Sequence, residues 1–147
     1  MRYPVAAPRG RKAFTLVELA VVIVIIGVLA AFGVPRFLKS VERSKAAEAF
    51  SYLSAVRAAQ ERYSAQQGTY ASDLTALDIQ MSTPKYFTVG TVNPGVSGTL
   101  QNSWTLTLTR TGASAGYGAY TVTFTEDGFD TANSTINGLP DINPMGN

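Results

Sequence analysis

The chain of 147 residues contains neither cysteine nor histidine. Without cysteine, no disulfide can hold the fold together. Without histidine, the chain lacks the commonest general base, the Ser–His and Cys–His nucleophile pairs, and the usual zinc ligand. A membrane-tethered hydrolase would have to rely on Asp73, Asp78 or Asp127, and no spacing or partner residue supports such a site. The composition therefore predicts that the chain is not an enzyme.

Negative charge is missing from the first thirteen residues, which contain Arg2, Arg9, Arg11 and Lys12. These four side chains account for the formal net charge of +2, because the rest of the chain holds eight basic and ten acidic residues. A nucleic-acid partner would depend almost wholly on this short basic tract. We therefore predict no specific nucleic acid partner.

A long stretch with a single charge follows, from Phe14 to Val34, and that charge is Glu18. As a helix this stretch is roughly 32 Å long, which matches the hydrocarbon core of a bilayer. The basic tract ahead of it favours a cytoplasmic N-terminus, with the rest of the chain on the outer side. A carboxylate at the centre of a membrane helix costs on the order of 2.5–3.5 kcal/mol, so Glu18 requires a compensating interaction.

Residues 1–13 are predicted to be a cationic segment without structure of its own, because Pro4 and Pro8 disfavour a helix. An alternative is a conventional secretory signal peptide, cleaved near Ala30, Ala31 or Gly33. Its apolar run is longer than usual for such a peptide, and no A-x-A motif closes it. A retained membrane helix is therefore favoured.

The helix is predicted to continue as an amphipathic half, so that one helix runs from about Phe14 to about Gln66 and stops before Gly68. Pro35 cannot donate a hydrogen bond to Ala31, which predicts a weak point there. Apolar residues in the second half recur at steps of three and four: Ala46, Ala49, Phe50, Leu53, Val56, Ala59 and Tyr63. Charged residues occupy much of the other face: Glu42, Arg43, Glu48, Arg57, Glu61 and Arg62.

Three runs beyond Gly68 alternate apolar residues with polar residues or glycine, as half-buried strands do. They lie at 87–90, 104–109 and 120–125, separated by the turn residues of 93–95 and 112–118. A loop with Ser72 as a helix cap precedes them. The connections contain no crossover helix, so we expect an antiparallel meander whose apolar face packs on the amphipathic half of the helix. The predicted fold class is α+β.

The C-terminal segment concentrates oxygen-bearing side chains that are candidate Ca²⁺ ligands: Asp127, Asp130, Asn133 and Asp141. The pattern does not match an EF-hand loop, and Asp127-Gly128 is a strong hairpin-turn signal, so turn chemistry is the favoured interpretation. Trp104 and the tyrosines are candidates for a carbohydrate or nucleic-acid platform. On the apolar face of a strand, Trp104 is predicted to be core instead.

The residues Lys12-Ala13-Phe14-Thr-Leu-Val-Glu18-Leu, with the apolar run behind them, resemble the class III signal of type IV prepilins and type II secretion pseudopilins. The close resemblance covers about residues 11–36, and the layout beyond is similar. It implies that prepilin peptidase cuts between Ala13 and Phe14 and methylates the new amine. The family generally has glycine before the cut, where this chain has Ala13.

The same resemblance implies that Glu18 pairs with the amino group of Phe14 in a neighbouring subunit. The alternative is that Glu18, only one turn into the helix, snorkels to the lipid headgroups. The resemblance also implies that Gly27, Gly33 and Pro35 are sites where the helix loosens in a filament. The expected organisation is a leader at 1–13, a transmembrane and filament-core helix at 14–35, and a head at 36–147. The head comprises the helix to about residue 66, a connecting loop, the sheet and a C-terminal loop.

By resemblance, the chain is a structural subunit of a type IV pilus that serves adhesion, twitching motility or DNA uptake. Its expected partners are other copies of itself, the inner membrane, prepilin peptidase, and the assembly platform and ATPase. It would lie in the inner membrane before assembly, and afterwards in an extracellular pilus or a periplasmic pseudopilus. A type II secretion pseudopilin is the alternative; these use a C-terminal calcium loop, but their Asp-Pro-Trp-Gly segment is missing. A membrane-anchored binding module, whose helix is only a tether, is the second alternative.

Overall fold

The computed structural model describes residues 14–146, so the expectations for the leader and for Ala13 lie outside the described residues. Helix α1 runs without interruption over Leu16–Gln67 and passes through Pro35. Gly68 ends it with a left-handed φ of 74°, and its N–H donates to the carbonyl of Ser64 at 2.8 Å. The prediction of one long helix is confirmed. The chain divides into two units between Arg36 and Phe37, which are described separately.

The first unit is apolar on all sides of its helix. From Phe14 to Val34 the large apolar side chains are between 48% and 83% exposed. An 18-residue window of α1 has a mean hydropathy of 2.8, with none of its residues buried. By length and composition, this part of α1 is able to cross a membrane. Its apolar surface has to be covered by lipid or by other protein chains.

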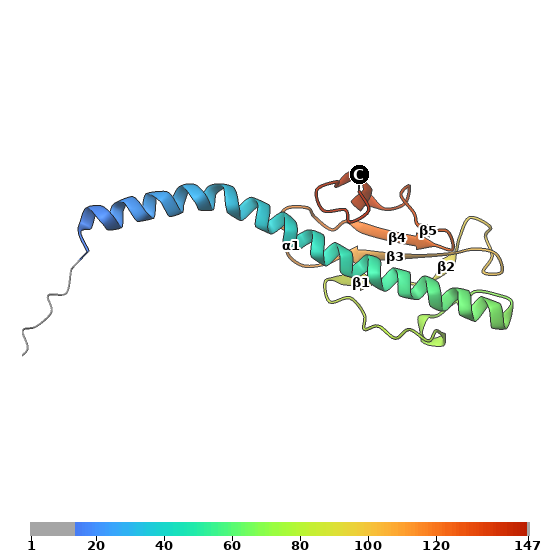
Figure 1. The fold of residues 1–147 in the computed structure, drawn as a ribbon. Helices are drawn as coiled ribbons and strands as arrows, with labels where there is room; N and C mark the ends of the chain where they lie inside the picture. Colours follow the sequence, from blue (N-terminus) through green and yellow to red (C-terminus); the bar gives the residue numbers. More distant parts are fainter. Residues whose placement is uncertain (1–13, 147) are drawn as a thin grey trace, which may run out of the picture. The chain divides into compact units, whose positions relative to one another are not determined.

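The second unit, which we call the head, contains one antiparallel sheet built around strand β3 (Trp104–Arg110). On one side β3 pairs with β1 (Phe87–Val89) and β2 (Asn93–Pro94). On the other side it pairs with β4 (Thr121–Thr125), which pairs with β5 (Gly128–Phe129) (Figure 1). The predicted meander is confirmed. Of the residues 93–95 expected as a turn before β3, the first two instead form β2, and Gly95 starts a turn in which its carbonyl accepts from the N–H of Gly98.

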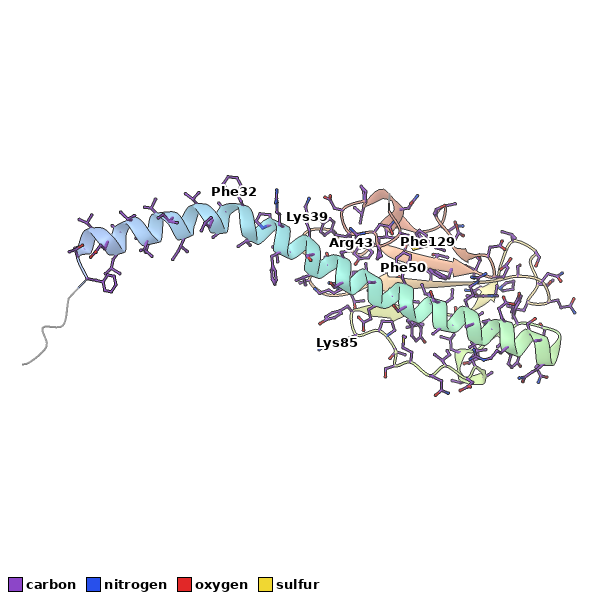
Figure 2. All side chains as sticks on the ribbon, viewed as in Figure 1. Phe32, Lys39, Arg43, Phe50, Lys85 and Phe129 are labelled. Atoms are coloured by element: carbon purple, nitrogen blue, oxygen red, sulfur yellow. The ribbon has the colours of Figure 1, made fainter. Side chains whose placement is uncertain are left out.

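The predicted stripe of α1 packs on the apolar face of this sheet, which confirms the α+β fold. Buried residues of the stripe are Ala46, Ala49, Phe50, Leu53, Val56 and Ala59. The Phe50 ring lies 5.8 Å from the Phe124 ring and 4.8 Å from the Phe129 ring, centroid to centroid. Phe50 and Phe129 are labelled in Figure 2. Such pairs add about 0.5–1.5 kcal/mol to the effect of burial alone. The register sets Leu106 opposite Phe124, which places both on the helix side.

The connection after α1 is fixed by Gln60, a buried side chain of the helix. Its Nε2 donates to the carbonyl of Ala71 at 3.0 Å, and its Oε1 accepts from the N–H of Ala71 at 2.8 Å. A short 3-10 helix, η1 (Leu74–Ala76), follows. Its cap is Asp73, so the prediction of Ser72 was wrong by one residue. The Asp73 carboxylate accepts from both the N–H and the hydroxyl of Thr75, two residues further along.

Trp104 is fully buried, as predicted for a core residue, and stacks edge-on near Tyr70 with ring centroids 6.5 Å apart. Its indole N–H makes no hydrogen bond within residues 14–146. A second 3-10 helix, η2 (Thr135–Gly138), lies beside the edge of β4 that does not pair with β3. There the N–H of Thr123 donates to the Ser134 hydroxyl at 2.8 Å.

Candidate functional site

The first turn of α1 is closed by a reciprocal pair of hydrogen bonds between Thr15 and Glu18. The N–H of Glu18 donates to the Thr15 hydroxyl oxygen at 3.2 Å, and the N–H of Thr15 donates to Glu18 Oε2 at 2.8 Å. The Thr15 hydroxyl also donates to Oε2 at 2.9 Å. This is a capping box, in which two backbone N–H groups that a helix start leaves free are satisfied.

The capping box gives Glu18 a compensating interaction within its own chain. Its carboxylate lies at the positive end of the helix dipole, where a negative charge is stabilised. Both bonds use Oε2, and Oε1 accepts no hydrogen bond from any residue that the structure describes. Glu18 is therefore held at the start of α1, and among the described residues no donor occupies its Oε1.

The sequence contains the signal for this box at Thr15 and Glu18, although the box was not predicted above. A Thr followed three residues later by Glu, directly before an apolar run, is typical of a helix start. Part of the compensation that Glu18 requires is therefore local, and its pairing with the Phe14 amine of a neighbouring subunit stays a prediction.

Gly27 and Gly33 lie inside α1 and, like Pro35, are helical. A Cβ added at either glycine would meet nothing within 4 Å in the described part of the chain. Packing inside the chain therefore does not require glycine at these positions. Glycine costs about 1 kcal/mol in a helix interior relative to alanine. The predicted role in helix flexibility, or close contact with another chain, would account for that cost.

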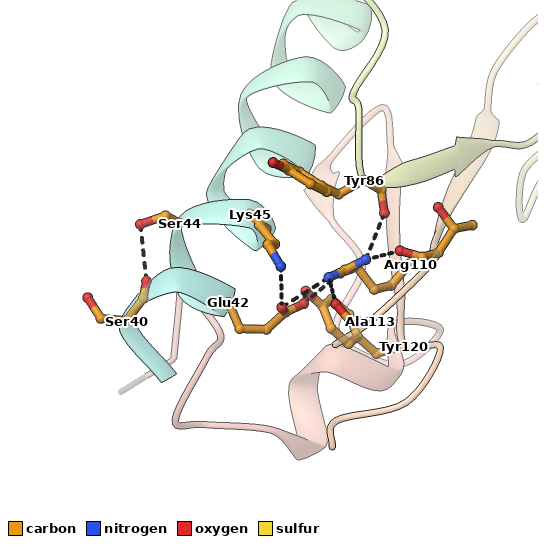
Figure 3. Close-up of polar contacts among 9 residues, drawn as sticks. Ser40, Glu42, Ser44, Lys45, Tyr86, Arg110, Ala113 and Tyr120 are labelled. Atoms are coloured by element: carbon orange, nitrogen blue, oxygen red, sulfur yellow. Dashed lines mark hydrogen bonds and ion pairs between the residues drawn. The ribbon is translucent and has the colours of Figure 1, made fainter. Parts of the chain in front are cut away.

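The head contains a buried charge network that joins α1 to the sheet (Figure 3). Arg110 of β3 donates from Nε to Glu42 Oε1 at 2.6 Å and from Nη2 to Oε2 at 3.1 Å. The Tyr120 hydroxyl donates to Oε1 at 2.9 Å, and Lys45 Nζ lies 3.3 Å from Oε2. Glu42 and Arg110 are 1% and 2% exposed. The prediction that Glu42 lies on the polar face of the helix was wrong, because Arg110 draws it into the core.

Electrostatics keep this network charged. Burial raises the pKa of Glu42, but the hydrogen bonds from Arg110 and Tyr120, with the charge of Arg110, bring it below its usual value. The pKa of Arg110 is raised, chiefly by its bonds to Glu42. Burial and the bond to Glu42 raise the pKa of Tyr120. The network is an ion pair that holds two elements together, and nothing in it is arranged as a nucleophile beside a base.

The candidate calcium ligands are only partly brought together. The Asp130 carboxylate accepts from the N–H of Ala132 at 3.0 Å and from the side chain of Asn133 at 2.7 Å. Asp141 instead pairs with Lys39 at 2.7 Å, and Asp127 precedes Gly128 in the turn between β4 and β5. Between residues 14 and 146 no group of three or more acidic side chains converges. Calcium binding stays a prediction.

Two family profiles match the chain. Residues 8–34 match the prokaryotic N-terminal methylation motif. Residues 35–134 match a family described as type IV minor pilin ComP, DNA uptake sequence receptor. The chain belongs to this type IV pilin family. Both the apolar helix and the head are therefore accounted for by matches that meet at Val34 and Pro35.

Individual pilins are similar to a part of this chain. The type IV major pilin protein PilA of Myxococcus xanthus is 44% identical over 64 residues, which are 44% of this chain and 29% of that protein. Fimbrial protein EcpC of Eikenella corrodens is 39% identical over 69 residues, 47% and 45% of the two chains. The narrow pilus major component PilA5 of Thermus thermophilus is 50% identical over 48 residues, 33% and 41%. The match spans less than half the length of each relative.

Type IV pilins are structural subunits and not enzymes. These comparisons favour a pilus subunit over the pseudopilin alternative. The methylation motif and the apolar helix together indicate a membrane-anchored precursor that passes into a filament.

Proposed function

We propose that this pilin is a structural subunit of a type IV pilus, cut between Ala13 and Phe14, methylated on the new amine, and assembled through its apolar helix. One observation carries the proposal. The pilin presents an apolar helix with exposed side chains, started by a capping box, at the N-terminus of a folded head. A helix of this kind needs two successive environments, lipid before assembly and other helices afterwards.

The capping box supplies a mechanism for coupling assembly to processing. Oε2 of Glu18 accepts the hydrogen bonds of Thr15 at the helix start of its own chain. Oε1 then accepts a hydrogen bond from the Phe14 ammonium of a neighbouring copy. That amine exists only after the leader has been removed. Because a buried charge that is paired and hydrogen-bonded is far less costly than a lone one, the cut chain fits the bundle better than the uncut chain.

Location and partners follow from the same segment. Four basic and no acidic residues precede Phe14, which supports a cytoplasmic N-terminus in the inner membrane. Processing there requires prepilin peptidase, and extrusion requires an assembly platform and its ATPase. The finished filament then lies outside the membrane, with other copies of the chain as its main partner.

DNA uptake is the second candidate, because the matched family is described as a DNA uptake sequence receptor. The charge of the head does not favour it. From residue 37 onward the sequence has seven basic and nine acidic side chains, whereas DNA-binding surfaces carry a marked basic excess. The structural role is therefore proposed first. A DNA role would require substitutions in the head that leave the filaments intact but abolish DNA uptake by the cells that carry them.

N-terminal sequencing of protein from sheared surface filaments tests the main proposal. A chain that begins at methylated Phe14 is the expected result. An intact Met1 in a dispersed membrane protein would overturn the filament role.

Two variants of Glu18 separate its two functions. Glu18→Ala removes both the cap and the charge. Glu18→Gln keeps the capping acceptor, since Gln serves at this position of the box, but removes the charge. We expect both variants to reduce filament yield to a similar extent while precursor accumulates normally in the membrane. Normal filaments from Glu18→Gln would mean that Glu18 acts as a helix cap and does not pair with the amine.

A further inference from the structure

Apart from Asp130, whose N–H donates to the carbonyl of Thr123 in the middle of β4, the charges of the head separate toward the two ends of its part of α1. The near end is where α1 enters the head, and the far end is where α1 stops at Gln67, about 46 Å further along at 1.5 Å per residue. Near-end basic side chains outnumber acidic ones by five to three: Lys39, Arg43, Lys45, Lys85 and Arg110 against Glu42, Glu48 and Asp141. At the far end there are five acidic and two basic side chains. The acidic ones are Glu61, Asp73, Asp78, Glu126 and Asp127, and the basic ones are Arg57 and Arg62.

Contacts within the head fix these placements. At the near end, the N–H of Lys85 donates to the carboxylate of Glu48 at 3.1 Å. At the far end, Arg57 Nε donates to the carbonyl of Glu126 at 2.7 Å. Arg62 Nη2 donates to the carbonyl of Asp78 at 2.9 Å. The loop that contains Asp73 follows directly after the end of α1.

The far end is left with uncompensated negative charge. All three ion pairs among residues 14–146 lie at the near end: Lys39–Asp141, Lys45–Glu42 and Arg110–Glu42. Both far-end guanidinium groups donate to backbone carbonyls. Consequently none of the five far-end carboxylates has a basic group within 4.0 Å in the described part of the chain.

The near end contains a cleft with surplus positive charge. It has a volume of about 400 Å³ and is lined by Val41, Ser44, Lys45, Glu48, Lys85 and Tyr86. Three cationic groups surround the Tyr86 ring: Lys45 Nζ at 5.0 Å, Lys85 Nζ at 5.8 Å and Arg110 Cζ at 5.6 Å from its centroid. The charge of Glu42 is balanced by its ion pairs with Arg110 and Lys45, whereas the Lys85 ammonium makes no ion pair among the described residues. Lys85 is exposed and labelled with Arg43 in Figure 2.

We propose that the heads stack along the filament with the acidic far end of one copy against the basic near end of the next. The cleft beside Tyr86 would then receive a far-end carboxylate. This inference rests on the proposed function, because it names the partner surface of that filament. In a helical homopolymer every copy has the same orientation, so contacts along the axis pair two different surfaces. Opposite charges at opposite ends satisfy that requirement, and they disfavour head-to-head contacts.

Charge reversal in the full-length pilin tests the stacking. Arg43→Glu with Lys85→Glu reverses the near end, and Glu61→Lys with Asp127→Lys reverses the far end. These four side chains are exposed or partly exposed and make no ion pair in the described residues. We expect each double variant to lower sheared filament yield about tenfold, and the four substitutions together to restore much of it. Arg43→Lys with Lys85→Arg keeps the charge and should leave the yield unchanged.

Several outcomes would overturn the stacking. Normal filament yield from both double variants would contradict it. A quadruple variant whose filament yield is no higher than that of either double variant would contradict it as well. A near-end reversal that impairs DNA uptake or binding to anionic vesicles, with normal filaments, would identify DNA or lipid as the ligand instead. An unmodified chain that forms no filaments would overturn the proposed function itself. Failure of the stacking proposal alone would leave filaments of the unmodified chain intact. Equal amounts of protease-resistant precursor in all variants control for folding.

Discussion

Glu42 of α1 and Arg110 of β3 form a buried, two-bond ion pair across 68 residues of sequence. The shorter bond is 2.6 Å, and Tyr120 donates a third hydrogen bond to the same carboxylate. The pair lies at the end of the head where α1 enters it. It therefore fixes the helix to the central strand at the point where the membrane segment and the folded head meet in the sequence.

Removing one partner of this pair should destabilise the head severely. Arg110→Met leaves the Glu42 carboxylate buried beside an apolar side chain, and such losses cost about 3–5 kcal/mol. Glu42→Leu combined with Arg110→Met removes both charges and should recover most of that loss. Denaturant unfolding of the detergent-solubilised pilin measures the free energy. Asp141→Asn, which breaks only the exposed pair with Lys39, is the matched control and should change little. Equal effects from Asp141→Asn and Arg110→Met would contradict the argument.

Acid should weaken the head through Glu42. Its pKa is lowered in the folded state relative to the ordinary 4.5, so the folded form binds the proton less readily than the unfolded form. The stabilisation is therefore fully present above about pH 4.5 and is lost as the pH falls through the lower, folded-state value. Unfolding midpoints measured from pH 7 down to pH 3 should fall steeply at the acid end. Glu42→Gln should be less stable at pH 7 and should show a shallower decline. An identical slope in the two proteins would rule out Glu42 as the source.

The capping box predicts a difference between two small substitutions of Thr15. Thr15→Ser keeps a hydroxyl that accepts from the N–H of Glu18, whereas Thr15→Ala does not. In the detergent-bound pilin, amide exchange at Leu16, Val17 and Glu18 should accelerate severalfold in Thr15→Ala and stay near normal in Thr15→Ser. Filament yield should follow the same order. Unchanged exchange in Thr15→Ala would show that the box does not define the helix start.

The two helix glycines offer a test of flexibility. The described chain leaves space for a methyl group at Gly27 and Gly33, so alanine should raise helix stability by about 1 kcal/mol per site. If these positions loosen in the filament, Gly33→Ala filaments should extend less when pulled in a force microscope. Ala30→Gly is a reverse control in the same segment and should not stiffen the filament. Unchanged extension in Gly33→Ala would remove flexibility as the reason for the glycine.

Much of this fold was visible in the sequence because it depends on periodicity. Steps of three and four placed Leu53 and Val56 on the buried face of α1, and alternation placed Trp104 in the core. The same periodicity also places both members of the Glu42–Arg110 ion pair on the buried faces, although the pair was not predicted. Arg110 is in phase with Trp104 and Leu108 on the inward face of β3, and Glu42 is one turn before Ala46 on the buried stripe.

What local pattern could not supply was the pairing itself. Neither Glu42 nor Arg110 is tolerable in a core alone, so each was interpreted without its partner. Only the antiparallel register brings the end of β3 beside the first turns of the head helix. The cap at Asp73 was missed for a related reason, since adjacent Ser and Asp residues both suit such a position and the backbone decides between them.

The burial of Trp104 makes the head observable on its own by fluorescence. It is the single tryptophan of the chain, and residues 14–36 contain neither tryptophan nor tyrosine. Its indole is fully buried beside Tyr70, so its emission should be blue in the folded head and shift to red on unfolding. Because all of this signal comes from the head, unfolding can be followed in a membrane, in a micelle or in an intact filament without any added dye.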